Sequence, residues 1–110
     1  EDQMHAVTAA SGSSPAYFFQ FLEAMQQGLI EMGLDEKQSR ELVQQAMLGS
    51  AKLVIENPQT ALSTLRENVT SKGGTTAAAL NVFHQHQFND IIKQAMQACV
   101  ARSQEMEKLF

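Results

Sequence analysis

Apolar side chains recur along most of the chain at the three- and four-residue spacing that is typical of an amphipathic helix. The pattern divides into five or six segments, with glycine, proline or serine near most of their boundaries. No run alternates apolar and polar residues, and no Asn-Gly or Asp-Gly pair marks a hairpin. The sequence therefore predicts an all-α protein, built as a helical bundle.

The first strong helix is predicted to begin after Ser11–Pro15, and a short lead-in helix precedes it within residues 1–10. Ser13 or Ser14 can serve as its N-cap, and proline suits the first turn because its missing N–H would be unpaired there. Gly33 ends this helix. Apolar residues lie on one stripe and also on the opposite side, which predicts a helix buried all round. The stripe holds Phe18, Phe21, Leu22, Met25, Leu29 and Met32, and the other side holds Tyr17, Phe19 and Ile30.

A long second helix is predicted between Asp35 and Asn57. Asp35 is its expected N-cap, with Gln38 in the capping-box position. The helix ends before Pro58, since a residue that precedes proline avoids the α region. Gly49 and Ser50 lower the helix propensity at its middle, so we expect another helix to cross closely there.

Three further helices complete the pattern. Pro58 is expected to start a shorter helix, and another runs from Thr75 to about His84. A polar patch at residues 84–87 separates it from the last helix. That helix has the clearest amphipathic spacing in the chain, carried by Phe88, Ile91, Ile92, Ala95, Met96, Cys99, Val100 and Met106.

The first strong helix is apolar on most of its circumference, and so is much of the last one. A chain of 110 residues has few other elements with which to bury these faces. We therefore expect a second copy to cover part of them, in an intertwined or isologous homodimer. The alternative is that the five or six helices cover one another within one chain.

One segment, Val69–Leu80, breaks the apolar periodicity with small, hydroxylated and glycine residues. Gly73 and Gly74 allow positive φ and close approach of a ligand. From Thr75 onward the residues predict the first turns of a helix, whose leading N–H groups lack partners and carry partial positive charge. Such a helix start binds carboxylate or phosphate. The same residues also fit an ordinary capped loop, so both interpretations stay open at this point.

Composition and charge narrow the possible functions. The chain is 44% hydrophobic with a net charge of −4, which gives no basic surface for nucleic acid or an anionic membrane. It has no apolar run long enough for a membrane span and no secretory signal. Cys99 is the only cysteine, so no internal disulfide forms and a reducing cytoplasm is expected.

Other candidate chemistry is poorly supported. His84 and His86 are two residues apart, which points them to different faces of a helix, and we expect no metal site. Cys99 lies on an apolar stripe and is expected to pack rather than react. The segment Lys72–Thr76 lacks the earlier glycine and the preceding strand of a nucleotide phosphate loop.

Two motifs in order carry a resemblance to a known family: Ser11-Gly-Ser-Ser-Pro-Ala-Tyr17 and Leu65-Arg-Glu-Asn-Val-Thr-Ser-Lys-Gly-Gly-Thr-Thr76. With the tail Ala98–Ser103, the chain resembles the C-terminal domain of pyrroline-5-carboxylate reductase over essentially all of its length. It departs from the family's common form at Lys72, where proline is frequent, and at Ser14, where glycine is frequent. Neither departure touches the glycine pair or Thr76, so only the rigidity of the loop is affected.

The resemblance implies an enzyme that reduces 1-pyrroline-5-carboxylate to L-proline with NAD(P)H, the last step of proline biosynthesis. It implies a helical domain like the C-terminal dimerisation domain of the 6-phosphogluconate dehydrogenase-like reductases, assembled as an intertwined dimer or a higher oligomer. Residues 1–110 would be one dimerisation and substrate-binding domain. The N-terminal Rossmann domain of the family, which binds NADP or NAD, would be absent, because the chain has no Gly-x-Gly-x-x-Gly fingerprint. We therefore expect this chain alone to bind no cofactor and to be inactive.

The resemblance also implies roles for the loop residues. The Ser71 hydroxyl and the N–H groups of Gly73, Gly74, Thr75 and Thr76 would bind the substrate carboxylate, which gains roughly 0.3–2 kcal/mol from the helix dipole. The Thr76 hydroxyl would hold or relay a proton at the ring nitrogen. The alternative is a non-enzymatic all-α interaction module in which the loop is only a cap.

Overall fold

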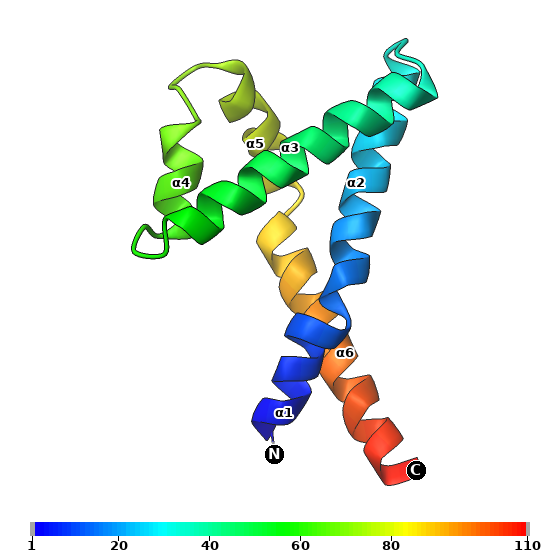
Figure 1. Cartoon of the computed structure of the whole chain (residues 1–110). Coiled ribbons are helices and arrows are strands. Elements are labelled where there is room, and N and C mark those ends of the chain that lie inside the picture. The colour runs from blue at the N-terminus through cyan, green and yellow to red at the C-terminus, as the bar shows by residue number, and fades with distance from the viewer. Residues whose placement is uncertain (1, 110) are drawn as a thin grey trace. The chain divides into compact units, whose positions relative to one another are not determined.

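The computed structural model describes residues 2–109, and these residues form helices and connecting turns with no strand among them. The all-α prediction is confirmed (Figure 1). The elements are α1 (Asp2–Val7), the π-helical turn η1 (Thr8–Gly12), α2 (Ser14–Glu31), α3 (Glu36–Glu56), α4 (Leu62–Asn68), α5 (Thr75–Gln85) and α6 (Phe88–Leu109). None of the helices in the described part of the chain is both long and apolar enough to cross a membrane.

The chain divides into two compact units. The first combines the residues up to Phe19 with those from Leu80 onward, and the second comprises Gln20–Ala79. Helices α2 and α5 each begin in one unit and end in the other.

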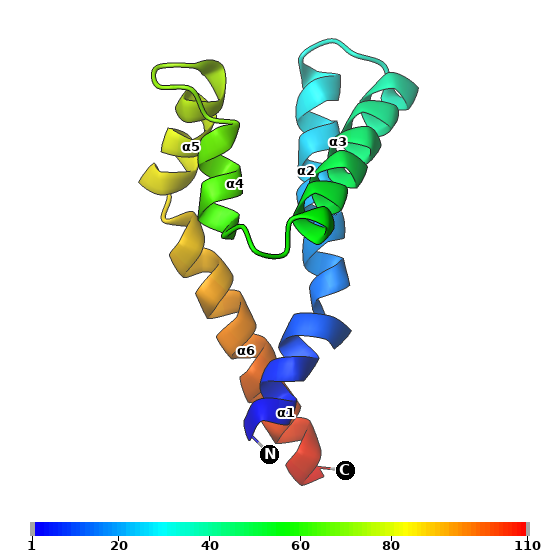
Figure 2. The same cartoon turned by 60° about the vertical axis from the view of Figure 1, so that its left-hand side comes forward.

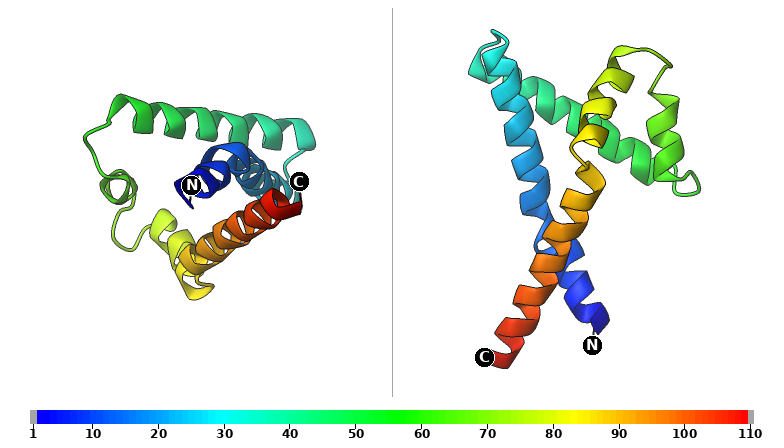
Figure 3. Two further views of the ribbon diagram at one scale, coloured as in Figure 1. Left: turned by 90° about the horizontal axis from the view of Figure 1, so that it is seen from below. Right: turned by 180° about the vertical axis from the view of Figure 1, so that it is seen from behind.

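In the first unit, α1 and η1 pack against α6 (Figures 2 and 3). The predicted break between helices at the serine-rich segment is almost absent, because η1 continues to Gly12 and only Ser13 lies outside a helix. The hydroxyls of Thr8, Ser11 and Ser14 each donate to the carbonyl four residues earlier, instead of capping a helix. η1 also packs against α6, and this packing favours the helical form of the segment.

The start of α2 also differs in part from the prediction. Pro15 lies in its first turn, as expected. Neither serine acts as the predicted N-cap, because both hydroxyls are engaged elsewhere. The Ser14 hydroxyl donates to the Ala10 carbonyl, and the Ser13 hydroxyl accepts from the Cys99 thiol.

In the second unit, the turn between α2 and α3 follows the sequence signals closely. Gly33 has φ of 109°, and the Leu34 and Gly33 N–H groups donate to the Leu29 and Ile30 carbonyls at 3.1 and 3.0 Å, a Schellman end. Asp35 caps α3, because its Oδ1 accepts from the Gln38 N–H at 2.7 Å. Both predictions are confirmed.

The connection from α3 to α4 is longer than predicted. α3 ends at Glu56, just before Asn57-Pro58, as expected. Pro58 does not start the next helix. The Thr60 N–H donates to the Asn57 carbonyl at 3.0 Å and closes a turn, so α4 begins only at Leu62.

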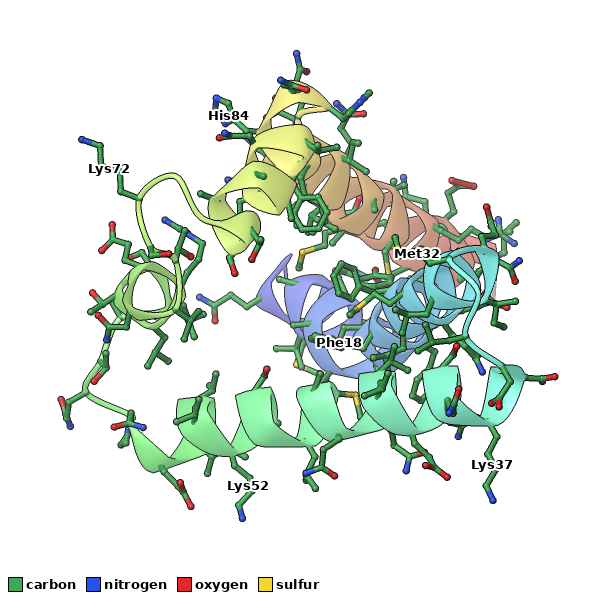
Figure 4. The ribbon with its side chains drawn as sticks, turned by 90° about the horizontal axis from the view of Figure 1, so that it is seen from above. Phe18, Met32, Lys37, Lys52, Lys72 and His84 are labelled. Carbon is green, nitrogen blue, oxygen red and sulfur yellow. The ribbon has the colours of Figure 1, made fainter. Side chains whose placement is uncertain are left out.

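Very little apolar surface is buried within one chain. Among the described residues, the buried apolar side chains are Ala9 in the first unit and Val43 in the second. No residue of α2 is buried, and Phe18 and Met32, labelled in Figure 4, are 62% and 79% exposed. The prediction that α2 is buried all round is therefore wrong for a single chain.

The middle of α3, at Gly49, is also uncovered. No atom lies within 4 Å of the position that a Cβ would occupy at Gly49. Among the described residues of its own unit, no helix crosses closely at Gly49.

Candidate functional site

Residues 69–74 form the loop that connects α4 to α5 (Figure 1), and the loop contains a turn at Gly73. The backbone leaves α4 with the Thr70 N–H donating to the Glu67 carbonyl at 3.0 Å, while the Thr70 hydroxyl donates to the Arg66 carbonyl at 2.6 Å. The Gly74 N–H then donates to the Ser71 carbonyl at 3.0 Å. Gly73 has φ of 73°, a left-handed conformation that glycine adopts without steric cost.

The first turn of α5 presents free donors. The Ala78 N–H is the first that finds a carbonyl, that of Gly74, at 3.1 Å. The N–H groups of Thr75, Thr76 and Ala77 have no acceptor among the described residues, as expected for the start of a helix. No acidic side chain lies in this turn. An anion placed there would meet three donors and the positive end of an 11-residue helix.

Gly74 is required for a different reason from Gly73. A Cβ at Gly74 would collide with the Ser71 hydroxyl oxygen and would lie 3.2 Å from the Ser71 carbonyl oxygen. The absence of a side chain at Gly74 thus leaves room for the Ser71 hydroxyl. Gly73 suits the positive φ of the loop, whereas Gly74 leaves the space that Ser71 occupies.

All five predicted site residues (Ser71, Gly73, Gly74, Thr75 and Thr76) lie in this one turn and helix start. Ser71, Thr75 and Thr76 are exposed, and Gly74 is half-buried. The Lys72 side chain extends away from the loop (Figure 4). The Gly74 N–H, assigned to the substrate carboxylate from the sequence, donates here to the Ser71 carbonyl, and the free N–H groups are those of Thr75, Thr76 and Ala77. The binding and proton-handling roles assigned to these residues stay predictions.

The histidines at the end of α5 do not join a metal-ligating group. His84 lies in the last turn of α5, and Gln87, just before α6, has φ of 56°. Within residues 2–109 there is no cluster of three or more His, Cys, Asp or Glu side chains that could hold a metal ion.

A polar cluster that sequence reasoning missed surrounds Cys99 in the first unit. The Cys99 thiol donates to the Ser13 hydroxyl at 3.2 Å. The nearby Tyr17 hydroxyl oxygen is shielded from solvent and has no well-formed hydrogen bond to any described group. The Cys99 side chain, and then burial, raise the pKa of Tyr17 above 10.0. The only sequence signal was the four-residue spacing of Ser13 and Tyr17, and nothing in the sequence paired them with α6.

We expect an alkaline titration to reveal this contact, because Tyr17 is the only tyrosine and the chain has no tryptophan. Phenolate absorbance should rise at a higher pH in the folded chain than in denaturant, and Cys99→Ala should reduce the difference. Since folding raises this pKa, the neutral phenol is the favoured form. Its contribution to stability is full below the unfolded pKa and is lost as pH rises through the folded pKa. Ser103→Ala, on the same helix as Cys99, is the control and should leave the titration unchanged. Equal midpoints in folded and unfolded chains would contradict the assignment.

A second missed cluster joins α1 to the end of α6. His5 is 9% exposed. Its Nδ1 lies 2.7 Å from the Ser103 hydroxyl, and its Nε2 lies 2.7 Å from a Glu107 carboxylate oxygen. Ser103 and Glu107 are four residues apart and so share one helix face. The sequence offered no reason to pair them with His5.

Comparison with known proteins gives a consistent result. Residues 1–106 match the family model described as pyrroline-5-carboxylate reductase dimerisation. The chain is 76% identical over 110 residues to the pyrroline-5-carboxylate reductase of Haemophilus influenzae, covering all of this chain and 41% of that protein.

Solved structures agree in fold. The Plasmodium falciparum pyrroline carboxylate reductase, crystallised with NADP bound, superposes with a TM-score of 0.90 at 31% identity, over 96% of this chain and 40% of that one. The pyrroline-5-carboxylate reductase of Coxiella burnetii gives a TM-score of 0.90 at 36% identity, over 96% and 38%. The chain thus spans about two fifths of the length of the proteins that it matches.

Proposed function

Because the chain belongs to the pyrroline-5-carboxylate reductase dimerisation family, we propose that it is the self-associating, substrate-binding part of an enzyme that reduces 1-pyrroline-5-carboxylate to L-proline with NAD(P)H. The observation that carries the substrate site is the start of α5. Three unpaired N–H groups lie there with no acidic side chain in the turn, and Ser71 precedes them in the same loop. The substrate's carboxylate has the charge that such a helix start favours.

The partner for self-association is a second copy of this chain. A dimerisation family implies self-association. An intertwined homodimer would bury the exposed side chains of Phe18, Phe19 and Met32 on α2. A helix of the second copy could also pack in the open space beside Gly49 on α3. Because each unit buries only one apolar side chain on its own, the two copies would depend on each other for most of their core.

The dinucleotide belongs to another part of the protein. Residues 2–109 contain no strand, and hence no strand followed by a glycine-rich turn and a helix, the arrangement that holds a dinucleotide pyrophosphate. We assign NAD(P)H to an N-terminal Rossmann domain of the full-length enzyme, with residues 1–110 as one dimerisation and substrate-binding domain. We further propose that the protein acts in the cytoplasm, where the free thiol of Cys99 is stable.

The proposed reduction needs both the cofactor of the N-terminal domain and the loop of this chain. The cofactor, when bound, supplies hydride to the imine carbon of the substrate. The imine nitrogen then takes a proton, so that the C=N double bond becomes a C–N single bond. The loop of this chain would hold the carboxylate and fix the ring. The exposed Thr76 hydroxyl, at the second residue of α5, would lie at the ring nitrogen and hold or relay that proton.

Thr76→Ala in the full-length protein tests this assignment. We expect turnover to fall by roughly 10²- to 10⁴-fold, the range for removing a positioned proton-transfer group, while NAD(P)H affinity stays nearly unchanged. Steady-state rates of NAD(P)H oxidation and a separate measurement of cofactor binding give the two quantities. Thr76→Ser keeps the hydroxyl and should retain most of the activity. Unchanged turnover in Thr76→Ala would remove Thr76 from the mechanism.

A further inference from the structure

A single residue in an unfavourable backbone conformation joins α5 to α6. Gln87 follows the end of α5 and has φ of 56°. Among residues 2–109 it is the only residue other than glycine with a positive φ. The left-handed conformation costs free energy for a residue that carries a Cβ. The contacts on either side of Gln87 must therefore hold it there.

Backbone hydrogen bonds support this conformation from both helices. The Gln87 N–H donates to the His84 carbonyl at 3.0 Å. The His86 N–H donates to the Val82 carbonyl at 3.1 Å, and these two bonds close the end of α5. The Gln87 carbonyl accepts from the Ile91 N–H at 3.0 Å, in the first turn of α6. Gln87 thus ends one helix and begins the next.

An aromatic pair spans the same bend. Phe83 lies in α5, and Phe88 is the first residue of α6. Their ring centroids are 4.9 Å apart and their planes differ by 17°, a stacked arrangement at a favourable distance for two aromatic rings. Both residues belong to the same compact unit, which includes Leu80–Phe110. Because Gln87 lies between the two rings in the sequence, a change in its backbone conformation would separate them.

We infer that Gln87 is a positioning residue for the proposed substrate loop. Its left-handed backbone and the Phe83–Phe88 stack form a rigid α5–α6 joint, which fixes the end of α5. α5 is one continuous helix of 11 residues, and a rigid helix transmits a constraint from one end to the other. The free N–H groups at its first turn are then held ready for the substrate carboxylate. The inference rests on the proposed function, because it concerns the same site.

Substitutions at position 87 separate the backbone conformation from the identity of the side chain. Glycine adopts the left-handed conformation without steric cost, and asparagine tolerates it, whereas a β-branched residue strongly disfavours it. Gln87→Gly and Gln87→Asn should therefore keep the α5–α6 joint, and Gln87→Val should open it. Gln85→Val is the matched control, because Gln85 is also an exposed glutamine but lies within α5.

Amide hydrogen exchange in the full-length protein tests the joint without using activity. In Gln87→Val, the amides of His86 and Ile91 should exchange at least about fivefold faster than in the unmodified protein, given the penalty for a left-handed residue. The Ala78 amide, at the start of α5, should also exchange faster. Gln87→Gly should not speed exchange at any of the three, and Gln85→Val should change it by about twofold or less.

Steady-state kinetics test the positioning role. Gln87→Val should raise the KM for 1-pyrroline-5-carboxylate by about 2- to 10-fold, the range for one weakened hydrogen bond, and should leave the KM for NAD(P)H nearly unchanged. Gln87→Asn should restore the KM for 1-pyrroline-5-carboxylate. A purely structural joint would lower stability alone.

Three results would overturn the inference. Unchanged exchange at His86 and Ile91 in Gln87→Val, or equally fast exchange in Gln87→Gly, would exclude the joint. Unchanged exchange at Ala78 would exclude its coupling to the start of α5. An active Gln87→Val enzyme with an unchanged KM for 1-pyrroline-5-carboxylate would exclude the positioning role and leave the proposed function standing. A full-length protein that reduces no 1-pyrroline-5-carboxylate would instead overturn the proposed function, and the positioning role with it, whatever the exchange rates show.

Discussion

Gly74→Ala in the full-length protein should raise the KM for 1-pyrroline-5-carboxylate by about 10- to 100-fold, which corresponds to the loss of one hydrogen bond to a charged group. The added Cβ would collide with the Ser71 hydroxyl oxygen. A serine side chain can rotate away, so the fold loses little, but the Ser71 hydroxyl, which we propose binds the substrate carboxylate, would leave its present position. The Ser71 carbonyl, at 3.2 Å from the same Cβ, needs to move only a few tenths of an ångström.

Gly73→Asn is the matched control for Gly74→Ala. No atom lies within 4 Å of a Cβ at Gly73, and asparagine tolerates its left-handed conformation better than other side chains. We expect a nearly unchanged KM and a small loss of thermal stability. Steady-state kinetics and thermal unfolding of the full-length variants measure both quantities. If the loop were only a helix cap in a non-enzymatic module, valine at position 73 or 74 would change stability alone.

Phe18→Asp should dissociate the homodimer. Phe18 is 62% exposed in the single chain and lies on the α2 face that a second copy would cover. Burying a phenylalanine contributes about 1.5–3 kcal/mol, and in an isologous dimer the change occurs twice. The dissociation constant should therefore rise by at least about 100-fold, before the cost of burying a carboxylate is counted.

Sedimentation of the 12.1 kDa chain over a range of concentrations measures this effect. Gln20→Asp adds the same charge to the same helix at an exposed polar position and should leave the dimer intact. If Phe18→Asp sedimented as the unmodified chain does, the face of α2 that carries Phe18 would not be the dimer interface. Partial unfolding together with dissociation would fit the account, because each unit buries only one apolar side chain.

Much of the fold followed from local signals in the sequence. The end of α2 at Gly33, the Asp35 cap and the start of α5 at Thr75 are each determined by a few neighbouring residues, so their sequence signals were sufficient. The segment at Ser11–Ser14 was misjudged for a physical reason. Its hydroxyls can cap a helix or donate back to earlier carbonyls, and packing of η1 on α6 favours the second use.

The candidate site was predictable as a segment but not in its detail. Serine, glycine and threonine in that order fitted either an anion-binding helix start or an ordinary cap, and all five residues lie at the start of α5 or in the loop before it. The geometry of the loop gives the two glycines different roles: Gly73 adopts a positive φ, and Gly74 leaves space for Ser71. The contacts of His5 with Ser103 and Glu107 join the two ends of the chain, and no local pattern specifies such a pairing.

The most direct test of the central claim is NAD(P)H oxidation in the presence of 1-pyrroline-5-carboxylate, measured for the full-length protein and for residues 1–110 alone. We predict substrate-dependent oxidation by the full-length protein and none by residues 1–110, which would still sediment as a dimer. Oxidation by residues 1–110 alone, or its absence from the full-length protein, would contradict the account.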